Sequence, residues 1–86
     1  MYKLVYKYKE TEEDKVLVEK EYSSGNPFRL KRNAVHYLLD IIQSEYRAEG
    51  YGTEQITGGA IYCYKSELTT EKKRIAIEWT ICIKKI

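Results

Sequence analysis

The sequence predicts an α+β fold in which a four-stranded antiparallel sheet carries one long helix on one face, in the order ββαββ. Residues 28–49 repeat apolar side chains at steps of three and four, which is typical of an amphipathic helix. One helix covers only one face of such a sheet, and 86 residues allow a single domain, residues 1–86. Four segments alternate in hydropathy with period two, as strands do: residues 2–9, 15–22, 60–68 and 73–86.

The first hairpin is predicted to turn at ETEED, residues 10–14, a polar and acidic stretch. Pairing Lys9 with Lys15 across this five-residue loop places Tyr8 opposite Val16. The tyrosine side of the first strand and the valine side of the second then coincide, which supports an antiparallel pairing.

The helix is predicted to follow a break at SSGNP, residues 23–27. Asn26 can accept a hydrogen bond from the first turn as the N-cap, and Pro27 suits the first helical position. Gly50 is expected to end the helix in a left-handed conformation.

The last two strands are predicted to form a second hairpin after a glycine-rich loop, residues 50–59. A four-residue turn, residues 69–72, pairs Tyr64 with Ile77 and places apolar side chains together on one face. This register puts Tyr62 and Tyr64 on the face that the helix covers.

The two cysteines are expected to be small apolar strand residues. The predicted register places Cys63 and Cys82 on one face, roughly 13 Å apart at about 3.3 Å per residue. A disulfide needs Cα atoms within about 7 Å, so none is expected. With His36 as the one histidine, the chain lacks a four-ligand zinc set. No metal or other cofactor is expected.

The uncovered face of the predicted sheet mixes small and apolar residues with charged ones. An apolar patch with a charged rim indicates an interface on a small domain, so a protein partner and a homodimer are expected. The extra burial in a dimer would also help a chain whose own core is small. The small or apolar residues on this face are Val5, Leu17, Ile61, Cys63, Ala76, Thr80 and Cys82.

Catalysis is not expected, because no segment matches a catalytic motif. The Gly50-Tyr51-Gly52 stretch follows a helix rather than a strand, so it is a poor phosphate cradle. Ser23 and Ser24 lie in a turn without a GxSxG context. A small ligand held by the glycine-rich loop and Tyr51 is a further, weaker hypothesis.

Nucleic-acid binding is the main alternative hypothesis, because basic side chains cluster at two places. A basic helix start opposes the helix dipole, so stability alone does not explain it. A net charge of only +2 argues against a strong nucleic-acid binder. The candidate contacts are Arg29, Lys31, Arg32, His36, Lys84 and Lys85.

The start of the sequence, MYKLVYKYK, lacks the apolar stretch of a signal peptide, and no apolar run approaches the roughly 20 residues of a membrane span. A cytoplasmic protein without membrane contact is therefore expected. The stretch YKLVYKYKETEED is similar to the first hairpin of small archaeal chromatin proteins, but nothing after it matches, so no family is assigned. The composition is similar to that of small proteins from AT-rich phages and mobile elements. The function predicted is a non-catalytic protein that binds a protein partner, with inhibition of that partner as one form this action can take.

Overall fold

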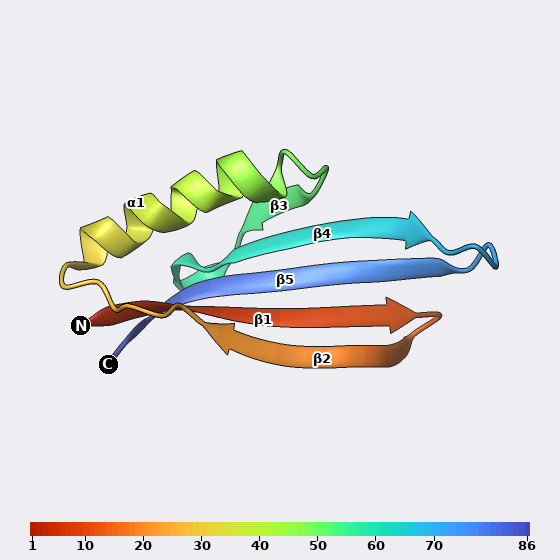
Figure 1. Ribbon diagram of the computed structural model, residues 1–86, viewed down its shortest axis with the longest axis horizontal. Coiled ribbons are helices and arrows are strands. Elements are labelled where there is room, and N and C mark those ends of the chain that lie inside the picture. Colours follow the sequence, from red (N-terminus) through yellow and green to blue (C-terminus); the bar gives the residue numbers. More distant parts are fainter.

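The computed structural model describes residues 1–86 as an antiparallel sheet with one α-helix, α1 (Lys31–Ile41), on one face (Figure 1). The α+β class and the antiparallel sheet are as predicted. The sheet has five strands, however, in the spatial order β2-β1-β5-β4-β3. The strands are β1 (Tyr2–Glu12), β2 (Lys15–Ser23), β3 (Gly52–Gln55), β4 (Ile61–Leu68) and β5 (Arg74–Lys85).

The additional strand, β3, lies inside the stretch predicted to be a loop, so the observed order is ββαβββ. Thr53 pairs with Cys63, and β3 covers only the first half of β4. A four-residue strand that begins with glycine is too short to show a period of two, which explains why it was not predicted. A short 3₁₀ turn, η2 (Thr57–Gly59), then leads into β4.

The first hairpin is tighter than predicted, because its strands run through most of ETEED. Only Glu13 and Asp14 form the turn, and both have left-handed φ values of 47° and 67°, as a type I′ turn requires. Tyr8 therefore faces Lys20 rather than Val16. The shift is an even number of residues, so the tyrosines keep their predicted face. A bulge beside Glu10 leaves Leu17 without a direct partner.

The second hairpin differs from the prediction by one residue. Leu68 pairs with Arg74 across a five-residue loop, in which the Thr69 N–H donates to the Lys73 carbonyl at 2.8 Å. Lys72 in this loop is left-handed, with φ 63°. A one-residue shift turns every side chain of β4 to the other face of the sheet. The predicted face of each β4 residue is therefore wrong.

The helix is shorter than predicted at both ends. Phe28 does not begin it but forms a β-bridge with Tyr2, in which each N–H donates to the other residue's carbonyl. Leu30 occupies the N-cap position without a side-chain cap, so the predicted capping by Asn26 is wrong. After α1 the chain forms a π-helical turn, η1 (Ile42–Tyr46). Gly50 is left-handed at φ 89°, as predicted.

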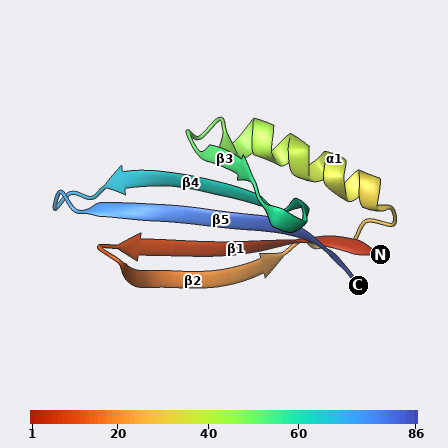
Figure 2. The ribbon, with the colours of Figure 1, turned by 180° about the vertical axis from the view of Figure 1, so that it is seen from behind.

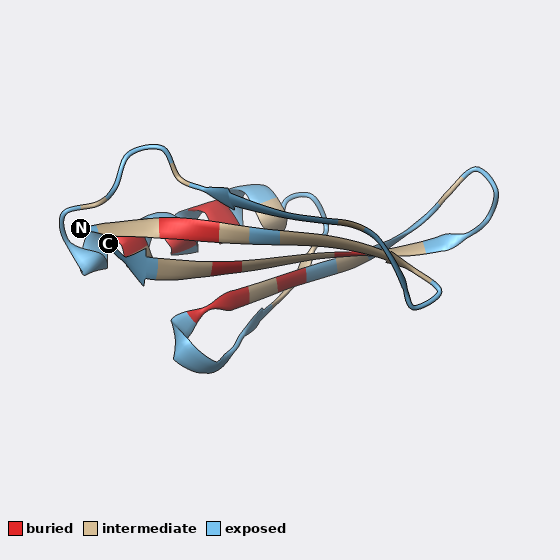
Figure 3. Cartoon of the chain, turned by 90° about the horizontal axis from the view of Figure 1, so that it is seen from below, coloured by how far each residue is buried: buried red, intermediate tan, exposed pale blue.

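The core lies between α1 and the half of the sheet nearest the chain termini. Ala34, Leu38 and Ile41 of the helix are buried in one cluster with Leu4 and Ile81 of the central strands. The hairpin ends project beyond the helix and give a molecule of 46 × 23 × 23 Å (Figure 2). Buried residues accordingly concentrate beside the helix, while the hairpin ends stay exposed (Figure 3).

The two cysteines lie on opposite faces of the sheet. Cys63 pairs with Trp79 and is buried beneath the helix, whereas Cys82 pairs with Val5 and is half-buried on the other face. Both thiols are free, which confirms that there is no disulfide. Their predicted placement on one face is wrong, because it depended on the β4 register.

Candidate interaction surfaces

The side of the sheet away from α1 has no element covering it, and we call it the open face. Strand pairing places Val5 beside Cys82 in one row, and Thr80 beside Tyr62 in the next. Val5 is only 6% exposed, whereas Cys82, Thr80 and Tyr62 are half-buried. The open face therefore has a patch of small and aromatic side chains on β4 and β5, with the buried Val5 of β1 at its edge and Glu78 between Thr80 and Ala76. The members of this patch are Val5, Tyr62, Tyr64, Ala76, Thr80 and Cys82.

Charged side chains of both signs lie around the patch and, at Glu78, within it. Across the β1–β2 pair, Lys7 faces Glu21 and Lys9 faces Glu19, and across the β1–β5 pair Lys9 faces Glu78. Opposite charges on facing strands stabilise the pairing modestly. The open face as a whole has five cations and four carboxylates: Lys3, Lys7, Lys9, Arg74, Lys84, and Glu19, Glu21, Glu54, Glu78.

The two tyrosines of β4 form the aromatic part of the patch. The rings of Tyr62 and Tyr64 are stacked, with centroids 5.3 Å apart. The Tyr62 hydroxyl donates a hydrogen bond to Glu78 Oε1 at 2.8 Å, and burial together with this bond raises the pKa of Tyr62 to about 12. The Tyr64 ring packs over Gly52, where no Cβ stands in its way, and 42% of Tyr64 is exposed.

The structure brings together only part of the predicted interface. Val5, Ala76, Thr80 and Cys82 lie on the open face as expected. Leu17 is exposed in the bulge of the edge strand β2. The prediction that Ile61 and Cys63 lie on this face is wrong, because both are buried in the core beneath α1. Tyr62 and Tyr64, which sequence reasoning had assigned to the covered side, take their place.

The predicted basic residues meet at one end of the molecule, which we call the basic end. Tyr2 pairs with Lys85 on one side and with Phe28 on the other, so the end of β5 lies next to the segment that leads into α1 (Figure 1). Lys3 joins this group as the cross-strand partner of Lys84. The basic end comprises Lys3, Arg29, Lys31, Arg32, Lys84 and Lys85, and none of them forms an ion pair. His36 is exposed on α1, one turn beyond Arg32.

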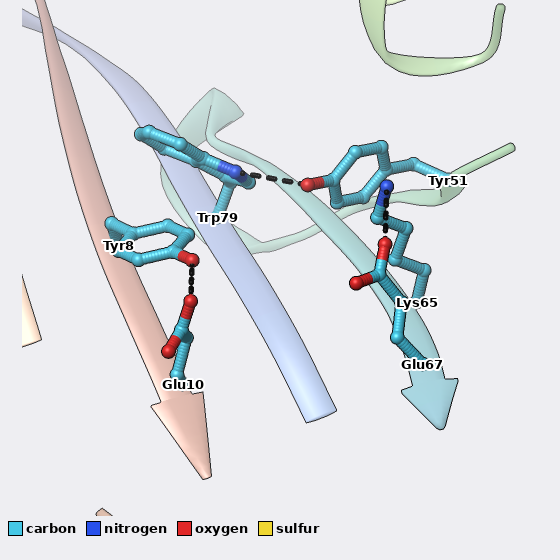
Figure 4. Close-up of polar contacts among 6 residues, drawn as sticks. All are labelled: Tyr8, Glu10, Tyr51, Lys65, Glu67 and Trp79. Atoms are coloured by element: carbon cyan, nitrogen blue, oxygen red, sulfur yellow. Dashed lines mark hydrogen bonds and ion pairs between the residues drawn. The ribbon is translucent and has the colours of Figure 1, made fainter. Parts of the chain in front are cut away.

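An aromatic cluster that sequence reasoning missed surrounds Trp79, on the helix side of the sheet. The ring centroid of Tyr8 lies 4.6 Å from that of Trp79, and the ring centroid of Tyr46 lies 5.9 Å from it. The Trp79 indole N–H donates to the Tyr51 hydroxyl oxygen at 3.3 Å (Figure 4). The β1–β5 pairing makes Tyr8 and Trp79 direct neighbours on one face of the sheet.

The one buried thiol has an environment that suppresses its reactivity. Burial raises the pKa of Cys63 to about 11, so its nucleophilic thiolate is scarce at neutral pH. His36 is exposed, whereas Cys63 is enclosed in the core. The two side chains are therefore not arranged as a nucleophile and its base.

Comparison with known proteins found no match to this chain among family models, curated proteins or solved structures. No helix of the structure has the length and apolar character needed to cross a membrane.

Proposed function

We propose that the chain is a small, non-catalytic intracellular interaction protein, of the kind that phages and mobile elements encode. Its open face binds a protein partner. The observation that supports this proposal is the patch of Tyr62, Tyr64, Ala76, Thr80 and Cys82, which lies on the face opposite α1 and whose side chains are half-buried or exposed. Small apolar groups, half-exposed tyrosines and a charged rim are the usual composition of a protein interface.

A second copy of the chain is the partner that the open face suits best. The charges on this face nearly balance, so two copies related by a two-fold axis can set the lysines of one against the glutamates of the other. The chain also buries only 11 of its 86 residues. Apolar surface buried between two copies would add to this small core.

Light scattering across a concentration series tests the proposal directly. The expected particle has twice the 10.2 kDa mass of the chain. Tyr64→Lys places a cation inside the patch, so it should raise the dimer dissociation constant at least about tenfold.

Leu39→Lys provides the matched control, because Leu39 is 52% exposed on the helix and remote from the open face. This variant should remain a dimer. A wild-type chain that is monomeric at every concentration would contradict the proposal. An equal rise of the dimer dissociation constant in Tyr64→Lys and Leu39→Lys would also contradict it.

Nucleic-acid binding through the basic end is a second candidate function, supported by the way the fold gathers six unpaired cations. Anisotropy of a labelled DNA duplex, titrated at two salt concentrations, tests it. If the basic end contacts phosphates, the affinity for DNA should fall steeply with rising salt. The affinity should also fall in Arg32→Gln, but not in Lys72→Gln, which lies at the opposite end of the molecule. An absence of binding at low salt would remove this candidate.

A further inference from the structure

A hollow of about 540 Å³ lies between the end of the helix and the aromatic cluster, on the side of the sheet opposite the open face. The aromatic rings of Tyr46, Tyr51 and Trp79 line it. Tyr46 meets Tyr51 at 5.4 Å and Trp79 at 5.9 Å, in both cases edge to face. The hydrogen bond from Trp79 to Tyr51 ties two of these walls to each other.

Carboxylates flank this aromatic hollow. Glu45 and Glu49 line it from the π-helical turn and the residues after it, and neither forms an ion pair. Glu10, which accepts a hydrogen bond from Tyr8, adds a further negative charge to the same cluster (Figure 4). The hollow therefore combines aromatic faces, which attract cations, with unpaired anionic groups.

The chain itself already places a cation on this cluster. Lys65 Nζ lies 4.4 Å from the centroid of the Tyr51 ring, and its charge is balanced by Glu67 at 3.2 Å. Figure 4 shows this ammonium group against the Tyr51 ring. The cluster is thus suited to cation–π contact, and Glu45 and Glu49 remain free to balance a second cation.

We infer that this hollow binds an arginine side chain presented by a protein partner. A guanidinium is planar and weakly hydrated, so it stacks on aromatic rings at small desolvation cost, and its five N–H donors suit carboxylate acceptors. A lysine ammonium is more strongly hydrated, and a quaternary ammonium has no donor for Glu45 or Glu49. Rings and free carboxylates together therefore favour arginine. The inference does not rest on the function proposed for the open face.

Fluorescence titration of the full chain tests this inference, because Trp79 is its one tryptophan and forms a wall of the hollow. The probes are three peptides that differ at one residue: acetyl-Gly-Arg-Gly-amide and its citrulline and lysine analogues. The arginine peptide should change the emission saturably and bind at least about fivefold more tightly than either analogue. No saturable change with the arginine peptide, or a preference for lysine or citrulline, would overturn the inference.

Two variants separate the carboxylate contribution from general effects. Glu49→Gln should lower the affinity for the arginine peptide about fivefold. Glu71→Gln, in the distant hairpin loop, should leave that affinity unchanged. If the Glu49→Gln variant bound the arginine peptide as tightly as the wild type does, the role assigned to that carboxylate would be overturned. Binding by the Tyr64→Lys variant would show that the hollow works without the open face, so the two proposals fail independently.

Discussion

The indole N–H of Trp79 lies 3.3 Å from the hydroxyl oxygen of Tyr51 and donates a hydrogen bond to it. This bond, drawn in Figure 4, joins the middle of β5 to the residue that directly precedes β3. Trp79 fluorescence therefore reports on the packing between β5 and the segment that follows the helix.

Removing the Tyr51 hydroxyl should lower stability measurably. Tyr51→Phe leaves the partly buried indole N–H without its protein acceptor, so the free energy of unfolding in urea should fall by about 1 kcal/mol and the Trp79 emission should shift. Tyr37→Phe is the control, because Tyr37 is 45% exposed and its hydroxyl makes no hydrogen bond to another side chain. An equal loss in both variants would contradict the role of the bond.

The core beneath the helix should dominate stability. Leu4 is fully buried there, so Leu4→Ala should cost about 3 kcal/mol by leaving a cavity. Leu39→Ala removes the same atoms from an exposed helix position and should cost less than about 0.5 kcal/mol. Urea unfolding of both variants measures the difference, and similar costs would contradict the packing of β1 against α1.

The two cysteines should react very differently with a thiol reagent. In dilute native protein, half-buried Cys82 should react quickly, whereas buried Cys63 should react only when the chain unfolds. The expected result is one fast thiol per chain in the wild type and none in Cys82→Ser. A fast-reacting thiol that persists in Cys82→Ser would show that the side chain of Cys63, in β4, points to the open face.

Stability should decline in alkaline solution because several folded-state pKa values are raised. Burial raises the pKa of Cys63 from 9.0 to about 11, so the unfolded chain ionises first, and the stability from this group is lost as pH rises from about 9 to 11. Cys63→Ala should make this decline shallower in urea unfolding at each pH, and Cys82→Ala should not. Equal declines in all three proteins would contradict the burial of Cys63.

Periodicity alone predicted the faces of the strands that form the centre of the sheet. The strict alternation from Ile75 to Ile83 and the helical spacing of Ala34, Leu38 and Ile41 both survive in the structure. These patterns are long, and burial on one face fixes them strongly. The side chains of β1 also kept their predicted face, although the hairpin turn was misplaced, because the error was an even number of residues.

The facing of β4 could not be predicted, because it depends on the conformation of a single loop. Lys72 adopts a left-handed φ that a non-glycine residue rarely adopts, and this extends the loop by one residue. The error placed Ile61 and Cys63 on the open face in place of Tyr62 and Tyr64. The hollow beside Trp79 was unpredictable for a second reason, since it needs both the strand order and the π-helical turn that places Tyr46.

The labelling rate of Cys82, measured against protein concentration, tests the central claim most directly. Cys82 lies inside the open-face patch, so a dimer formed through that face should cover its thiol. The rate should fall with rising concentration in step with the doubling of mass seen by light scattering, and it should stay constant for Tyr64→Lys. A Cys82 rate that does not change while the mass doubles would place the interface elsewhere and contradict the account.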